Sequence, residues 1–428
     1  MRANKFKLPF ILVIMLTFSV ILTACNLFGG DRPAVESVEF VQVAAGGTHS
    51  LALDSEGNIW SFGSSWNNGH GNTRAYRPRI IRTGHGNTPL PAFVYISASW
   101  GHSIAICEDG NIWTWGNGAW YDDYGVFVDR GWLGHGEAGS ESRPRMIIMP
   151  EDEEDDDPEY DDDDIEVPVF TAASAAHQQS AALDEDGNIW TWGGGYLRGL
   201  GHGESSSEWR PRMIETGFGG AELPAFTAIS MGEFQHHAIC EDGNLWVWRD
   251  HGPRMIDGIE GLDYAVAISS GRNHNMMICG RGYVWTWGAN AAARLLGHAA
   301  GEDGRVQGAA NPQRIADIEG LTNITAISAG YHFSMAVCGE GYIWTWGNGA
   351  SGKLGHGGVE VEPRPRRIEG VGGLTGVLAV SAGSQEHSIA VDGEGRVWTW
   401  GRASHGQLGH SSSRSELNRN VYTPRMLR

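Results

Sequence analysis

Short segments in which apolar and polar residues alternate recur along most of the chain. Two examples are HSLAL at 49–53 and NIWTW at 111–115. A period of two is typical of β-strands with one buried face. Asp-Gly and Gly-Asn steps stand between such segments, and these steps are typical of hairpin turns. Because no long stretch with helical period interrupts the repeated part of the chain, the sequence predicts an all-β fold.

Pairs of aromatic residues spaced i, i+2 give the pattern its repeat. Side chains two residues apart in a strand point to the same face, so each pair forms an aromatic stripe that a neighbouring unit must cover. Seven such pairs use 13 of the 18 tryptophans. Seven units at intervals close to the length of a four-stranded blade predict a seven-bladed β-propeller built from four-stranded repeats. The first residues of the pairs, expected in the core of each repeat, are Trp60, Trp113, Trp190, Trp246, Trp285, Trp344 and Trp398.

The complete unit resembles a known family. A small-residue segment (VAAGGTHSLAL in the first copy, ISAGYHFSMAV in the sixth) precedes the turn and the tryptophan strand, and a Gly-x-Leu-Gly stretch and a Pro-Arg segment follow. This order resembles the regulator of chromosome condensation (RCC1-like) repeat, whose members form seven-bladed propellers. The resemblance covers roughly 37–428. The fourth unit, Phe226 to Met255, lacks the Gly-x-Leu-Gly stretch. We expect repeats at about 37–92, 93–168, 169–224, 225–262, 263–322, 323–375 and 376–428.

The amino terminus has the layout of a secretory signal. Basic residues precede an apolar run from Leu8 to Leu22, which ends in Leu-Thr-Ala-Cys. This ending is similar to the bacterial lipobox, so we predict a lipoprotein signal peptide at 1–24, lipid on Cys25 and a tether at 25–36. An uncleaved membrane anchor is the alternative, but the run is shorter than the ~20 residues that a span requires. Either arrangement places the propeller on the extracytoplasmic side of the cell membrane.

The formal net charge of −20 restricts the partners. Nucleic acid attracts basic surfaces, so we expect no nucleic-acid binding. Membrane contact would depend on the lipid of Cys25 rather than on attraction to anionic headgroups. The acidic insertion at 151–166 contains 13 carboxylates. It is expected to be a solvated, disordered loop; the alternative is a collector of divalent cations or a docking strip for a basic partner.

Repeated cysteines, histidines and arginines are expected to be structural. The four cysteines stand at the corner before the turn, where other units carry aspartate, and they show neither disulfide nor zinc spacing. We expect small, half-buried strand ends at Cys107, Cys240, Cys279 and Cys338. Histidines that follow the glycine-rich stretch are predicted to be turn residues rather than metal ligands: His70, His135, His202, His298, His356 and His410. Arginines of the Pro-Arg segments are expected to pair locally with an acidic turn: Arg79, Arg145, Arg212, Arg254, Arg314, Arg366 and Arg425.

Catalysis finds no support in the sequence. It contains neither a nucleophile motif nor a phosphate-binding glycine loop, and paired carboxylates occur only in the acidic insertion. We therefore predict a non-catalytic protein without cofactor or metal. An enzyme whose site is assembled across blades remains the least favoured alternative.

The aromatic insertion from Asn117 to Trp132 breaks the repeat most strongly. Tryptophan and tyrosine are enriched at interface hot spots, so we predict a partner-binding site there. Its candidate residues are Trp120, Tyr121, Tyr124, Phe127 and Trp132. The alternative is that these rings pack down on the blades. Trp66, Trp100 and Trp209 also lie outside the strand pairs.

Two functions fit this insertion. The first is a protein-binding propeller at the cell surface, an interaction scaffold or an enzyme-inhibitor-like binder, expected to be a monomer with an unknown protein partner. The resemblance implies roles that range from nuclear GTPase exchange to enzyme inhibition, and the signal peptide excludes the nuclear partner. The second is carbohydrate binding at the cell envelope, for which Asp122 and Asp123 flank the rings.

Overall fold

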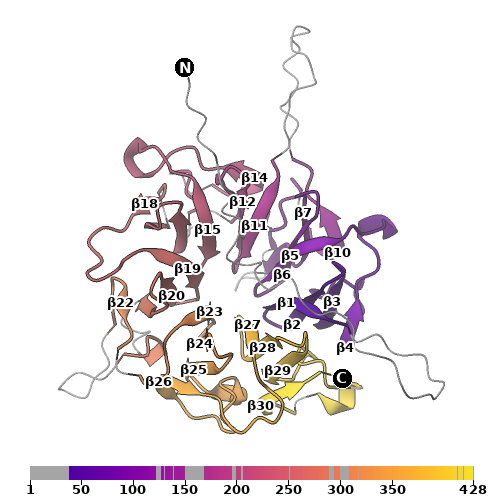
Figure 1. The fold of residues 1–428 in the computed structure, drawn as a ribbon. Helices are drawn as coiled ribbons and strands as arrows, with labels where there is room; N and C mark the ends of the chain where they lie inside the picture. The colour runs from indigo at the N-terminus through magenta and orange to yellow at the C-terminus, as the bar shows by residue number, and fades with distance from the viewer. Residues whose placement is uncertain are drawn as a thin grey trace, which may run out of the picture. The chain divides into compact units, whose positions relative to one another are not determined.

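Seven four-stranded antiparallel sheets follow one another around a ring, which confirms the predicted seven-bladed β-propeller (Figure 1). The structure is a computed structural model. It describes residues 38–121, 127–129, 131–137, 139–149, 168–194, 199–203, 206–249, 251–288, 294–298, 308–316, 318–411, 413–417 and 419–427. Within these ranges no helix has the length and apolar character that a membrane crossing requires. Residues 1–37, which include the predicted signal and tether, and the acidic insertion lie outside them.

Each blade is built from one continuous stretch of chain. The first three blades are β1 (Phe40–Ala45), β2 (His49–Asp54), β3 (Ile59–Gly63) and β4 (Ala75–Ile80); β5 (Phe93–Ala98), β6 (His102–Cys107), β7 (Ile112–Gly116) and β10 (Glu141–Met146); β11 (Phe170–Ala175), β12 (Gln179–Asp184), β13 (Ile189–Gly193) and β14 (Glu208–Met213). An added hairpin, β8 (Ala119–Tyr121) and β9 (Phe127–Asp129), lies between β7 and β10.

The remaining blades repeat this plan with shorter outer strands in the fourth and fifth. They are β15 (Phe226–Met231), β16 (His236–Cys240), β17 (Leu245–Trp248) and β18 (Arg254–Met255); β19 (Ala265–Ser270), β20 (His274–Cys279), β21 (Val284–Gly288) and β22 (Gln313–Arg314); β23 (Ile324–Ala329), β24 (Phe333–Cys338), β25 (Ile343–Gly347) and β26 (Glu362–Arg367); β27 (Val377–Ala382), β28 (His387–Asp392), β29 (Val397–Gly401) and β30 (Val421–Met426). Short 3-10 turns are η1 (His85–Asn87), η3 (Phe218–Gly220), η5 (Ala350–Gly352) and η6 (Arg414–Glu416).

The antiparallel order gives every blade the same two ends. The loops after the first and third strands lie at one end, and we call this side the loop face. The turns after the second strand and the linkers between blades lie at the other end, the turn face. The hairpin β8–β9 follows the third strand of its blade and therefore belongs to the loop face. The acidic insertion connects β10 with β11, so its attachment points belong to the turn face.

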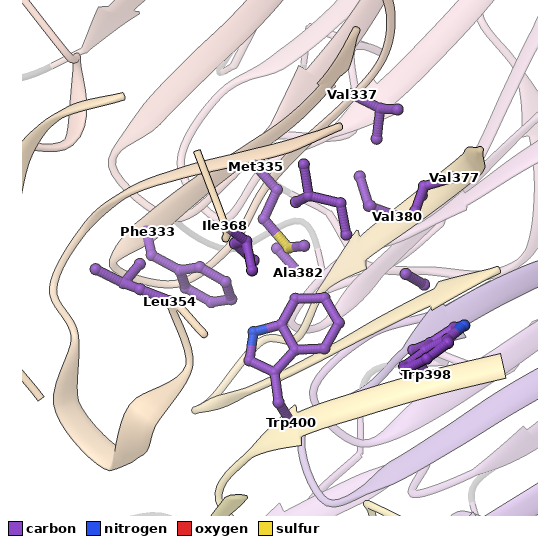
Figure 2. Close-up of a cluster of buried hydrophobic side chains, with 12 residues drawn as sticks. Phe333, Met335, Val337, Leu354, Ile368, Val377, Val380, Ala382, Trp398 and Trp400 are labelled. Carbon is purple, nitrogen blue, oxygen red and sulfur yellow. The ribbon is translucent and has the colours of Figure 1, made fainter. Parts of the chain in front are cut away.

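The hydrophobic core lies between neighbouring blades. Figure 2 shows the cluster where Phe333 and Met335 of the sixth blade meet Trp398 and Trp400 of the seventh. The second aromatic residue of every pair is buried: Phe62, Trp115, Trp192, Trp248, Trp287, Trp346 and Trp400. Of the first residues, Trp285, Trp344 and Trp398 are buried and the other four are half-buried. Each pair therefore contributes one ring to the deep core and one nearer to its edge.

The ring closes through contacts between whole blades and not through a shared strand. The first strand of the chain, β1, pairs with β2 of the first blade. The seventh blade consists of β27 to β30 alone and lies beside the first blade (Figure 1). Val43 and Phe62 of the first blade pack with Ile389 of the seventh. The Ala45 amide donates to Ser381 Oγ at 2.9 Å across the same junction.

The residue at the corner before each turn is aspartate in three blades and cysteine in the other four. Where the corner is aspartate, its Oδ2 accepts a hydrogen bond from the first tryptophan indole at 2.8 Å, as in the Asp54–Trp60, Asp184–Trp190 and Asp392–Trp398 pairs. Where the corner is cysteine, the thiol is free and buried, so the expectation of half-buried cysteines was wrong. In those four blades the indole nitrogen has no hydrogen-bond partner among the described residues. The four thiols therefore pack in place of a carboxylate that other blades use as an acceptor.

Local pairing of the Pro-Arg arginines is confirmed in three blades. Arg145 lies 3.1 Å from Glu141, Arg212 lies 2.9 Å from Glu208, and Arg366 lies 2.6 Å from Glu362. Each glutamate stands four residues earlier in the same outer strand. These pairs are largely exposed, so each is expected to contribute less than about 1 kcal/mol to stability.

Candidate functional site

The glycine-rich loops on the loop face join each blade to the next. The residue before the Leu-Gly-His sequence offers its carbonyl oxygen to the following blade. In the sixth blade, Lys353 O accepts from Ser388 Oγ at 2.9 Å and from Trp400 Nε1 at 2.8 Å. The carbonyls of Trp132 and Leu295 accept the same two bonds from the third and sixth blades. These buried bonds fix the spacing between blades and so provide a rigid support for the surface loops.

Histidines at the start of the second strands add a further set of bonds between blades. Nε2 of His49, His102, His274 and His387 lies 2.8–3.0 Å from a serine Oγ of the next blade. Ser50, the partner of His387, donates its own proton to Gln407 O, so the imidazole must donate at Nε2. Burial lowers the pKa of His49, His102 and His274 to about 3 and that of His387 to about 4. The four rings are therefore neutral at neutral pH.

The histidines of the glycine-rich loops are turn residues, as the sequence predicts. In each case Nε2 lies within 3.1 Å of a serine or threonine hydroxyl of the third strand, as in the His356–Thr345 pair at 2.8 Å. The same hydroxyl donates to the carbonyl of the neighbouring leucine or asparagine, as Thr345 does to Leu354. Within the described ranges no group of three potential metal-ligating side chains is found.

A band of charged and aromatic side chains surrounds the inner part of the loop face. It comes from the loops between the first and second strands, and its members bridge neighbouring blades. Trp100 lies 5.0 Å from the His177 ring. Arg272 pairs with Glu233 at 3.2 Å and stacks on Tyr331 at 4.3 Å. These side chains are half-buried, which makes the inner rim a recessed polar and aromatic surface. Except for Trp100, the sequence pattern did not indicate these residues, because each stands in an ordinary repeat loop.

Lys353 is the most unusual charged residue of this face. Its side chain is buried, and its ammonium lies 5.5 Å from the ring of Phe333. Phe333 begins the second strand of its blade, at the position where other blades carry histidine. Burial lowers the pKa of Lys353 to about 8, while Glu386 raises it. Glu386 accepts a hydrogen bond from Ser351 at 2.9 Å and lies 3.3 Å from Arg402. Ser351 belongs to the sixth blade, whereas Glu386 and Arg402 belong to the seventh. These contacts therefore connect the two blades.

The predicted partner-binding residues separate into two groups. Trp120, Tyr121 and Phe127 lie on the hairpin β8–β9, where Tyr121 pairs with Phe127 in the backbone register. Tyr124 lies outside the described residues. Trp132 is fully buried, and its carbonyl belongs to the junction with the third blade, so its assignment as an exposed binding residue is wrong. Its ring is buried and does not face solvent.

Two further tryptophans are exposed on the loop face. Trp66 is 57% exposed in the loop of the first blade, and Trp209 is 36% exposed at the start of β14. Gly131, which follows the hairpin, packs against the Trp209 backbone; an added Cβ at Gly131 would lie only 2.6 Å from Trp209 Cα. The hairpin segment of the second blade therefore continues onto an exposed aromatic residue of the third. Both tryptophans were recognisable because they stand outside the regular pairs.

Comparison with known proteins gives the relationship of the repeats. Models of the regulator of chromosome condensation (RCC1) repeat match 281–337, 340–391 and 394–427, and a second RCC1 model matches 40–72, 93–119, 324–353 and 377–407. The human E3 ubiquitin-protein ligase HERC2 is 25% identical over 91% of this chain, which spans 6% of that protein. The Ultraviolet-B receptor UVR8 of Arabidopsis thaliana is 24% identical over 90% of this chain and 71% of its own length.

Solved structures show the same fold. Yeast RCC1 (Prp20), in a structure with Kap60, superposes with a TM-score of 0.66 at 19% identity and covers 96% of this chain and 91% of its own. Human WBSCR16 superposes with a TM-score of 0.62 at 16% identity, and the match covers 81% of this chain and 85% of WBSCR16. These identities support the fold alone. Matches in the first, second, fifth, sixth and seventh blades show that this chain contains repeats of the RCC1 family.

Proposed function

We propose that this protein is a membrane-tethered, extracytoplasmic propeller that binds another protein through its loop face and performs no catalysis. The observation that carries the proposal is the hairpin β8–β9, an aromatic insertion that continues onto the exposed Trp209. Tryptophan and tyrosine supply large contact areas at low entropic cost, which suits a protein interface. The propeller beneath holds these groups in place through its buried inter-blade bonds.

Relatives support a binding role. RCC1-like propellers are commonly protein-interaction scaffolds and regulators. The structure of the yeast relative Prp20p is described together with its binding to Gsp1p and histones. The charge of −20 on the present chain favours a partner with a neutral or basic contact surface. The ligase named among the relatives is many times longer than this chain, so its activity gives no reason to propose an enzyme here.

Replacing Trp120 of the hairpin together with the exposed Trp209 is expected to abolish partner capture. The 26–428 propeller, coupled to a photo-crosslinker, would be exposed to surface proteins of the source organism. We expect a captured partner that is lost in the Trp120→Ala/Trp209→Ala variant, because interface hot spots of this kind cost about 2 kcal/mol or more when truncated. The matched control is Tyr264→Ala, 51% exposed on the turn face, which should leave capture unchanged. Equal capture by all three proteins would reject the loop-face site; retention on cell-wall polysaccharide alone would favour the carbohydrate alternative.

Membrane attachment through Cys25 is the second part of the proposal. Its support is the apolar run from Leu8 to Leu22 that ends at the lipobox-like sequence. We expect Cys25→Ser to move the protein from the membrane fraction to the soluble fraction and to abolish labelling by a radioactive fatty acid. The control is Cys338→Ser, at a buried propeller thiol that no acyl chain would reach. Membrane retention of the Cys25→Ser protein without label would indicate an uncleaved anchor instead.

A further inference from the structure

The outer strands contain a repeated arginine that reaches back to the preceding blade. It is the residue directly before the proline of the Pro-Arg segment: Arg77, Arg143, Arg210 and Arg364 in the first, second, third and sixth blades, of which the last three make the bonds described next. Arg143 donates to Thr83 Oγ1, Arg210 donates to Ile148 O at 2.8 Å, and Arg364 donates to Ala316 O at 3.1 Å. All three acceptors belong to the linker that leaves the preceding blade, so each guanidinium fills a slot at the outer edge of a blade junction.

Glycine forms the floor of these slots. In the first and second blades, the glycine that follows the Asn-Gly-His or Leu-Gly-His sequence lies directly against the incoming arginine side chain. An added Cβ at Gly71 would lie 2.9 Å from Arg143 Nε, and one at Gly136 would lie 2.5 Å from Arg210 Nε. In the sixth blade, Gly357 faces the shorter Thr423, whose Cγ2 lies 4.0 Å from the same point. The slot therefore depends on one residue from each of two neighbouring blades.

The junction between the third and fourth blades has the slot without its arginine. The fourth blade carries Gly252 in the arginine position, and an added Cβ at Gly203 would meet no atom of the described residues within 4 Å. A cavity of about 280 Å³ opens here, lined by Gly203, Glu215, Thr216, Phe218 and His251 among others. The fourth unit, which lacks the glycine-rich stretch, thus leaves open a position that the second, third and sixth blades fill with a guanidinium.

The residues that line this cavity offer the oxygen acceptors and the aromatic ring that a guanidinium group binds. Thr216 stands where Thr83 stands in the first blade and offers an equivalent hydroxyl acceptor. Glu215 adds an exposed carboxylate, and Phe218 lies 56% exposed beside the His251 ring at 5.7 Å. A planar guanidinium stacks on aromatic faces and donates in a fixed fork to oxygen acceptors, whereas an ammonium does neither as well.

The cation already in this junction does not exclude a second one. Arg212 lines the cavity, but it is paired with Glu208 at 2.9 Å. The first junction shows the same arrangement with its slot filled. There Arg79 and Arg143 both lie near His70, where they add to the effect of burial in lowering its pKa to about 4. Two guanidinium groups are therefore accommodated side by side in this architecture.

From these observations we propose that the cavity between the third and fourth blades binds an arginine side chain of a partner polypeptide. The ligand takes the place that Arg143, Arg210 and Arg364 take within the chain. The site lies apart from the hairpin β8–β9, and it stands whether or not the loop face binds a protein. Gly252→Arg is unsuitable as a test, because an added Cβ at Gly252 would lie 2.6 Å from Thr216 O and disturb the junction itself.

The test uses Nα-acetyl-arginine amide as the probe, titrated into the 26–428 propeller and followed by NMR. A ligand of this size is expected to bind with a dissociation constant of about 1 mM. The citrulline analogue, which has the same shape without the charge, should bind about tenfold more weakly or not at all. The lysine analogue should also be weaker, because it lacks the planar fork.

Variants decide whether the probe occupies this cavity. Glu215→Gln/Thr216→Val changes two exposed side chains and should weaken arginine binding about tenfold while leaving the melting temperature unchanged. The control is His85→Ala, at the exposed position equivalent to Phe218 beside a slot that Arg143 already fills; it should bind the probe as the unmodified protein does. Absence of binding at 20 mM probe, equal binding of citrulline, or unchanged binding by the double variant would each overturn the proposal.

Discussion

Lowering the pH from 7 to 5 is expected to destabilise the propeller by several kcal/mol. The main cause is the set of four buried histidines that bond through Nε2 to serines of the next blade: His49, His102, His274 and His387. Their pKa values of about 3 to 4 lie below the ordinary 6.5. Below pH 6.5 the unfolded chain therefore binds more protons than the folded one. The contribution of these histidines to the free energy of unfolding is complete above about pH 7 and is lost as the pH falls toward 4.

The expected magnitude follows from the linkage relation. One unit between pH and pKa corresponds to about 1.4 kcal/mol, so each histidine removes about 2 kcal/mol at pH 5. Four independent groups would remove on the order of 8 kcal/mol, a large part of the 5–15 kcal/mol that stabilises a typical domain. Neighbouring charges act in the same direction for three of them: His387 and His102 lower the pKa of His49, His177 that of His102, and His332 that of His274. Urea unfolding followed by circular dichroism between pH 5 and 8 measures the effect.

A substitution taken from the protein itself isolates this contribution. The third blade carries Gln179 in the histidine position, buried and bonded to Gly194 O at 2.9 Å. His274→Gln should therefore fold, lose some stability at pH 8, and show a pH dependence that is weaker by about one proton. Trp66→Ala, at an exposed loop position without a titratable group, is the control and should keep the pH profile of the unmodified protein. An unchanged slope in His274→Gln would show that the ring is already charged in the folded state.

The pattern of the sequence predicts the blades well because their cores are periodic. Paired tryptophans, hairpin steps and small-residue segments all depend on neighbours close in sequence, and seven copies reinforce one another. The burial of the four corner cysteines was predicted wrongly, as half-buried instead of buried. Their burial depends on the linker that reaches across from the next blade, as Val169 and Phe170 do over Gly110, which follows the Cys107 corner. Contacts of this kind join residues more than fifty positions apart, and no local pattern records them.

The candidate site was predictable only in part for the same reason. The aromatic insertion and Trp209 could be found because they interrupt the repeat. Trp132 belongs to the same insertion in sequence, yet its place before the Leu-Gly-His sequence makes it a buried junction residue. The empty arginine slot was hidden because its signal is an absence, Gly252 where four other blades carry arginine. Only the filled slots of neighbouring blades show what that glycine leaves open.

Trp400→Ala is expected to lower the free energy of unfolding by about 4 kcal/mol. The ring is fully buried between the sixth and seventh blades, where Met335 and Ile368 surround it (Figure 2). Removal of a buried tryptophan costs its transfer free energy and leaves a cavity, which together amount to about 3–5 kcal/mol. The indole hydrogen bond to Lys353 O is lost as well. Urea denaturation at pH 8, where the buried histidines do not contribute, measures the change.

Two comparisons separate packing from hydrogen bonding. Trp400→Phe copies the first blade, where Phe62 occupies the same position without an indole donor and is equally buried. It should cost about 1–2 kcal/mol, because Lys353 O keeps its bond from Ser388 and most of the ring volume remains. Trp66→Ala, at the 57% exposed tryptophan of the loop face, should cost less than about 0.5 kcal/mol. If Trp400→Phe lowered the free energy of unfolding as much as Trp400→Ala, the indole hydrogen bond rather than ring packing would stabilise this junction. The junction that contains Phe62 would then be the weakest of the seven junctions between blades.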